Sequence, residues 1–221
     1  MQSNKIPVNN KGKGLLKVLN ETENYAAREG YEGKYALHLR LLAEESLNML
    51  RSLTGTFRGE FWIESRSNQC VMTIQATAED APSKKSELLA LSKSGDNLME
   101  KGVFNKIRAV FESFAYNIEK SENWALIKEG MDLMPYDETL ANDPLYFGSA
   151  GISQSQIWSL QKYKEKMKHQ ATENPKARQA WDELEKSIVA NIASDVQVGV
   201  AGDKVKLVII ADFPKTGSSG K

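Results

Sequence analysis

Positions 41–77 read LLAEESLNMLRSLTGTFRGEFWIESRSNQCVMTIQAT, and this stretch decides the fold class. Its first part has the apolar spacing of a helix, which we expect over Tyr35–Leu53 and which Gly55 ends. Its second part holds two runs rich in β-branched and aromatic residues, Thr56–Glu64 and Cys70–Thr77, joined by a short polar stretch. A helix followed by a hairpin, within a chain of mixed patterns, predicts an α+β fold.

The rest of the chain adds further helices and a second hairpin. Apolar spacing and capping residues predict additional helices over Leu15–Glu29, Asn97–Lys120, Ser155–Lys168 and from Asn174 through Ile192. Alternating apolar residues predict strands over Val196–Val200 and Val205–Ile210. The stretch Glu129–Ser153 is rich in Pro, Gly, Asp and Asn and is expected to be a long loop, and residues 214–221 to be a disordered tail.

The composition is that of an ordinary globular protein. The 221 residues are 41% hydrophobic and 26% charged, with 29 basic and 29 acidic side chains. Zero net charge argues against a general nucleic-acid binder, which normally carries a basic excess. Cys70 is the single cysteine and lies in an alternating run, so we expect a buried strand position and neither a disulfide nor a thiolate metal cluster.

The opening residues lack the continuous apolar stretch of a signal peptide. No later segment approaches the roughly 20 apolar residues that span a bilayer. We therefore expect a cytoplasmic protein without a membrane partner.

Glu44 and Asn48 form a polar stripe on the helix Tyr35–Leu53. At about 100° per residue they stack one turn apart, opposite the main apolar face and beside Leu37 and Leu41. A partly enclosed Mg-nucleotide site needs such a pair, because an amide oxygen can ligate a hard cation and a carboxylate can orient or deprotonate an attacking group. The alternative is a solvated helix face with Arg40 and Arg51 as surface ion-pair partners.

The order of parts along the chain resembles that of the GHKL family of ATPases, which includes histidine kinases, type II topoisomerases and anti-sigma serine kinases. The parts that carry the resemblance are the helix with Glu44 and Asn48, the hairpin Phe57–Thr77, the acidic Asp80, the helix Trp181–Ser194 and the hairpin Asp195–Ile210. The resemblance covers about half the chain, residues 35–80 and 177–213. It implies a two-layer α/β sandwich of the Bergerat type over residues 35–213, with a mostly helical insertion at 81–175, preceded by a helical segment at 1–34.

The resemblance also implies roles for individual residues. Asn48 would bind Mg, Glu44 would act as the catalytic base or position the nucleophile, and Asp80 would contact the adenine amino group of ATP. The glycine motifs of the family are replaced here by other residues, and Gly95 and Gly102 are the glycines that could take their place near the phosphates.

Two functions follow from these observations. The first is an ATP-binding regulatory protein related to anti-sigma kinases, with ATPase or protein kinase activity and a protein partner, and it is favoured by Glu44 and Asn48. The second is a non-catalytic protein-interaction module that keeps the sandwich and has lost nucleotide binding, and it is favoured by the replaced glycine motifs.

Overall fold

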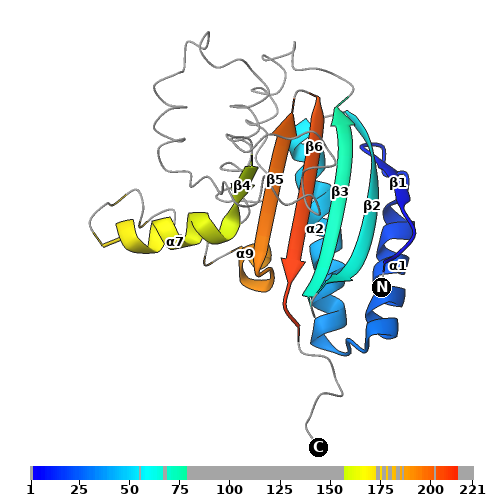
Figure 1. Ribbon diagram of the computed structural model, residues 1–221, viewed down its shortest axis with the longest axis horizontal. Coiled ribbons are helices and arrows are strands. Elements are labelled where there is room, and N and C mark those ends of the chain that lie inside the picture. The colour runs from blue at the N-terminus through cyan, green and yellow to red at the C-terminus, as the bar shows by residue number, and fades with distance from the viewer. Residues whose placement is uncertain are drawn as a thin grey trace, which may run out of the picture.

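The structure is a computed structural model that describes residues 2–54, 56–66, 69–78, 157–172, 187–201 and 203–213, with a few single positions between 172 and 187. These residues form an α+β fold in which helices pack on an antiparallel sheet (Figure 1). No helix in this described part of the chain is both long and apolar enough to cross a lipid bilayer.

The sheet has six strands in the order β1-β2-β3-β6-β5-β4, and all neighbours are antiparallel. The strands are β1 (Ile6–Asn9), β2 (Phe57–Arg66), β3 (Gln69–Ala78), β4 (Ile157–Ser159), β5 (Asp195–Ala201) and β6 (Lys204–Ala211). The pairing of β3 with β6 joins the two hairpins, with Ile74 opposite Leu207. The prediction of both hairpins and of a buried Cys70 in a strand is confirmed.

The helices are α1 (Leu15–Glu29), α2 (Lys34–Thr54), α7 (Leu160–Gln170) and α9 (Ile188–Ile192). α1 and α2 lie side by side on one face of the sheet, and α9 contacts α2 on the same face (Figure 1). α7 follows the edge strand β4 and extends away from the sheet (Figure 1).

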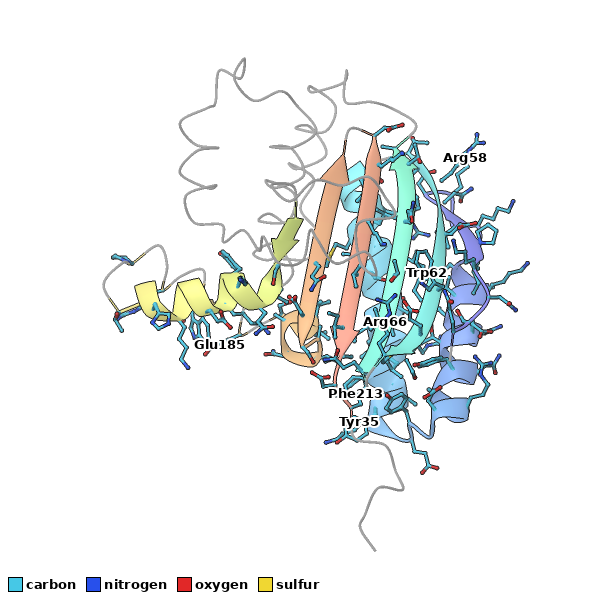
Figure 2. All side chains as sticks on the ribbon, viewed as in Figure 1. Tyr35, Arg58, Trp62, Arg66, Glu185 and Phe213 are labelled. Carbon is cyan, nitrogen blue, oxygen red and sulfur yellow. The ribbon has the colours of Figure 1, made fainter. Side chains whose placement is uncertain are left out.

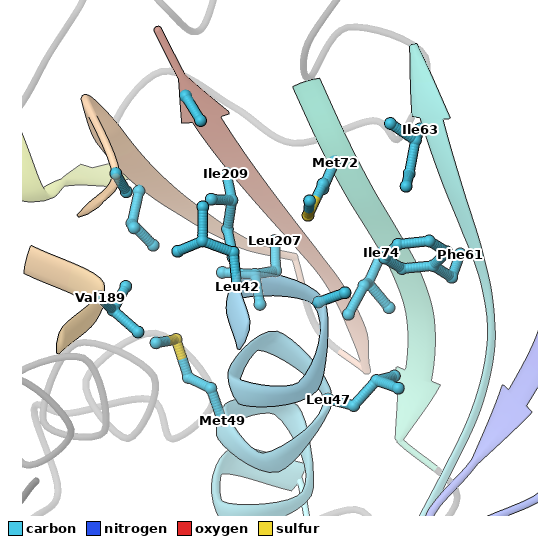
Figure 3. Close-up of a cluster of buried hydrophobic side chains, with 14 of the residues drawn as sticks. Leu42, Leu47, Met49, Phe61, Ile63, Met72, Ile74, Val189, Leu207 and Ile209 are labelled. Atoms are coloured by element: carbon cyan, nitrogen blue, oxygen red, sulfur yellow. The ribbon is translucent and has the colours of Figure 1, made fainter. Parts of the chain in front are cut away.

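The hydrophobic core lies between α2 and the sheet. Leu42 and Leu47 of α2 point toward residues of the central strands, and Met49 lies beside Val189 of α9 (Figure 3). The strand residues in this core are every second residue, because successive side chains of a strand point to opposite faces. In β6 the residues of both faces are buried from Val205 to Ala211, and β6 lies between β3 and β5 within the sheet.

Two short strands differ from the predicted elements. Ile6–Asn9 pairs with β2 as β1, within a segment expected to be helical. Ile157–Ser159 pairs with β5 as β4, so the expectation that a helix runs from Ser155 is wrong in its first turn. Both segments are too short to show a periodic pattern, and each becomes a strand because a sheet edge offers hydrogen-bond partners.

The expectation of one continuous helix from Asn174 through Ile192 is also wrong. Ser187 has an extended backbone, and its side chain accepts a hydrogen bond from the backbone N–H of Ala190. Ser187 therefore caps α9 as a separate short helix. The expected helix Asn97–Lys120, the loop Glu129–Ser153, the tail and most of the insertion lie outside the described residues.

Candidate functional site

Glu44 and Asn48 lie one turn apart on α2, on the side that faces away from the sheet. The inward side holds completely buried residues such as Leu42. Glu44, Asn48 and Leu41 are only partly buried, and Leu37 is 55% exposed. We call Leu37, Leu41, Glu44 and Asn48 the outer stripe. Its position on the helix is the one that the helical spacing predicts.

Two arginines flank the outer stripe, and both reach toward the N-terminal part of the chain. Arg40 forms an ion pair with Glu23 of α1. Arg51 lies one turn beyond Asn48, and its guanidinium comes within 3.7 Å of the position that a Cβ atom on Gly12 would occupy. These contacts join α2 to α1 and to the loop that precedes α1.

The other predicted site residues are Asp80, Gly95 and Gly102, and they lie outside the described residues. Residues 81–156 of the inserted segment also lie outside the described residues. The structure therefore brings together Glu44 and Asn48 from the predicted set, and the remaining contacts of the predicted nucleotide site stay predictions.

A second group of polar residues gathers in the loop between β1 and α1. The side-chain oxygen of Asn9 accepts hydrogen bonds from the backbone N–H groups of Lys11 and Lys13, at 3.0 and 3.1 Å. Gly14 has φ 88°, and a Cβ atom there would come within 2.2 Å of the Pro7 carbonyl oxygen. Only glycine fits such a position, so the sequence of this loop fixes its fold against β1.

This loop forms one wall of a cavity of about 280 Å³, which we call the loop cavity. Its lining residues are Asn9, Asn10, Lys11, Lys13, Phe57 and Arg58. Phe57 is completely buried, whereas both lysines and Arg58 are exposed. Arg58 lies at the end of the sheet opposite Phe213 and Tyr35 (Figure 2). Three of the residues that line the cavity are therefore exposed and cationic.

The loop cavity is not among the sites that the sequence predicts. The signal that could have drawn attention to it is the run NNKGKG at positions 9–14, in which lysines alternate with glycines directly before a helix. The run indicates a binding loop only if a strand precedes it. β1 has four residues, which are too few to show the alternation that predicts a strand.

A buried carboxylate lies at the opposite edge of the sheet. Asp195 of β5 accepts hydrogen bonds from the Ser159 hydroxyl, the Gln197 side-chain amide, and the backbone N–H groups of Gln161 and Val196, at 2.8 to 3.0 Å. The bond from Gln161 caps the first turn of α7. Four donors satisfy this carboxylate, so its role is to hold α7 and β4 against β5.

Lys164 of α7 extends this polar group. Its ammonium donates to the Ala190 carbonyl oxygen. Burial lowers the pKa of Lys164, and the charge of Asp195 acts in the opposite direction. This contact ties α7 to α9.

In the part of the chain that the structure describes, no group of three or more His, Cys, Asp and Glu side chains could hold a metal ion by itself.

The chain matches no protein-family model, no curated protein and no solved structure.

Proposed function

We propose that this chain is an Mg-ATP-binding regulatory protein of the GHKL type, located in the cytoplasm, in which the outer stripe of α2 is one wall of the nucleotide site. The observation that carries the proposal is the pair Glu44 and Asn48, which lie one turn apart and partly exposed on a helix whose opposite side is packed on the sheet. Two further observations support a sandwich of the Bergerat type. Along the chain, α2 precedes the β2–β3 hairpin and α9 precedes the β5–β6 hairpin, and both hairpins belong to one sheet.

The residues of the outer stripe fit an Mg-nucleotide in their chemistry. Mg²⁺ prefers oxygen ligands and usually takes one or two from the protein, with phosphates and waters supplying the rest. The Asn48 amide oxygen is a ligand of this kind, and when bound the ion would neutralise phosphate charge. The Glu44 carboxylate, one turn away, can hold a proton or orient an attacking hydroxyl or water. Asp80 would contact the adenine, and Gly95 and Gly102 would lie near the phosphates.

The competing function is a protein-interaction module without nucleotide. The observation that favours it is the exposure of Leu37, which lies on the same stripe two turns before Glu44. An exposed leucine beside half-buried Leu41 is a feature of helix faces that bind other proteins.

Titration of the full chain with Mg-ATP separates these functions. A ligand that binds only the folded state at ten times its dissociation constant stabilises it by about 1.4 kcal/mol. For a chain of this size, the melting temperature should rise by roughly 3 to 6 °C. Asn48→Ala should remove most of this rise, whereas Glu44→Ala should keep binding and suppress hydrolysis or phosphoryl transfer.

The matched control is Asn20→Ala, since Asn20 is an exposed asparagine on α1. This variant should keep the full Mg-ATP shift. Absence of any shift in the wild type at millimolar nucleotide, with Mg present, would reject the ATP-binding function and favour the interaction module.

A further inference from the structure

The loop cavity is strongly cationic. Lys11, Lys13 and Arg58 line it, and none of its described lining residues is acidic. The exposed ends of the lysines belong to adjacent turns of one short loop, and the Asn9 side chain holds the backbone of that loop in place. Positive charges that are held close together repel one another, and an anion bound between them removes this repulsion.

The first turn of α1 adds to the positive potential. α1 begins directly after Gly14, its N-terminus has no side-chain cap hydrogen bond, and its first turn contains no acidic residue. The N-terminus of a helix carries a partial positive charge, which anions or acidic side chains normally balance. Here the charges of Lys11 and Lys13, which precede α1, have the same positive sign as the N-terminus of the helix.

Arg51 adds a fourth cation beneath the loop. Its guanidinium approaches Gly12 from α2, and its buried Nε atom has no hydrogen-bond partner among the residues that the structure describes. A buried charged donor without a partner is costly, and a negative charge on the other side of the loop would lower that cost.

We propose that the loop cavity is a binding site for a phosphoryl-type oxyanion, with Lys11 and Lys13 as its charged ligands. The cavity volume of about 280 Å³ lies just below the roughly 300–1,000 Å³ of pockets that hold whole small-molecule ligands. The site is large enough for a phosphate or pyrophosphate group. It needs no metal ion, and it uses none of the residues proposed for Mg-ATP.

The test is calorimetric titration of the full chain with inorganic pyrophosphate in the presence of a chelator. We expect saturable binding by the wild type that weakens as the salt concentration rises. Each exposed lysine contributes modestly to anion binding, so the double variant Lys11→Gln with Lys13→Gln should weaken binding by about tenfold.

The control is a variant with the same change in charge at a distance from the loop, Lys168→Gln with Arg178→Gln, both exposed. It should bind like the wild type. Because Lys11 and Lys13 are exposed and only their backbones hold the loop, the test variant should also keep the wild-type melting temperature, which shows that it folds. Equal binding by the two double variants, or no saturable binding by the wild type, would overturn the proposal.

Two further measurements define the site. Asn48→Ala should bind pyrophosphate like the wild type, because Asn48 belongs to the proposed Mg-ATP site and not to the loop cavity. A failure of the Mg-ATP proposal and a failure of the oxyanion proposal are therefore distinguishable. Sedimentation with phosphatidylcholine vesicles that contain phosphatidic acid distinguishes a lipid phosphate from a free one. Sedimentation without pyrophosphate binding would overturn a site for a small free anion.

Discussion

Gly14 determines how the chain passes from β1 into α1. Its φ of 88° and the 2.2 Å approach of a would-be Cβ to the Pro7 carbonyl oxygen exclude every residue with a side chain. Gly33 also has a positive φ, of 55°, but no atom lies within 4 Å of its would-be Cβ. A side chain at Gly33 would therefore face only an unfavourable backbone conformation, whereas a side chain at Gly14 would also clash with the backbone of Pro7.

Gly14→Ala is therefore expected to destabilise the protein more than Gly33→Ala. A left-handed backbone costs an alanine roughly 1–2 kcal/mol, which is the whole expected effect at Gly33. At Gly14 the clash with backbone adds to this, and the total loss should reach at least about 3 kcal/mol. Urea unfolding of both variants measures the difference. Equal losses would show that the loop does not approach β1 as closely as described.

At the scale of the element, α2 has two sides with different functions. Its inward side carries fully buried residues of the core, and its outer stripe carries the candidate site. Leu42 is completely buried, and Leu37, fewer than two turns away on the same helix, is 55% exposed. A substitution on one side should affect stability, and a substitution on the other should affect only binding.

Leu42→Ala is expected to lower the free energy of unfolding by about 2–5 kcal/mol, because it leaves a cavity against the sheet. Leu37→Ala, the matched change on the outer stripe, should stay within about 0.5 kcal/mol of the wild type. Denaturant unfolding gives both values. If the protein is an interaction module, Leu37→Ala should reduce partner binding without this loss of stability.

At the scale of the whole molecule, one hydrophobic core connects the two ends of the described chain. Phe213, after the last strand, packs edge-on against Tyr31 with ring centroids 6.0 Å apart, and lies 5.3 Å from Tyr35 and 5.9 Å from His38. Burial raises the pKa of Tyr31 to about 12, with smaller contributions from Cys70 and nearby acidic groups.

This raised pKa makes the stability of the whole molecule sensitive to alkali. Tyr31 ionises near pH 10 in the unfolded chain but only near 12 in the folded one, so the stabilisation present below pH 10 is lost as the pH rises from 10 to 12. Tyr31→Phe removes this contribution. The loss of unfolding free energy between pH 9 and pH 11 should then be about 1 kcal/mol smaller than in the wild type, as measured by urea unfolding. An identical loss in both proteins would contradict this assignment.

The features that depend on neighbouring residues are predictable from the local sequence. α1 extends over Leu15–Glu29 as predicted, between Gly14 and Gly30, which both have positive φ. The strands β2 and β3 follow from alternation, and the outer stripe with Glu44 and Asn48 follows from the helical period. These features require no knowledge of distant contacts.

Contacts between distant parts of the chain determine β1, β4, the break at Ser187 and the loop cavity. A four-residue or three-residue strand has no pattern of its own and forms where a sheet edge supplies its hydrogen bonds. The loop cavity combines residues 9–13 with Phe57 and Arg58, which come from a distant part of the sequence. Local periodicity does not predict this contact between distant segments. The contact depends on how β1 pairs with β2 and on the approach of Arg51 from α2 to the loop.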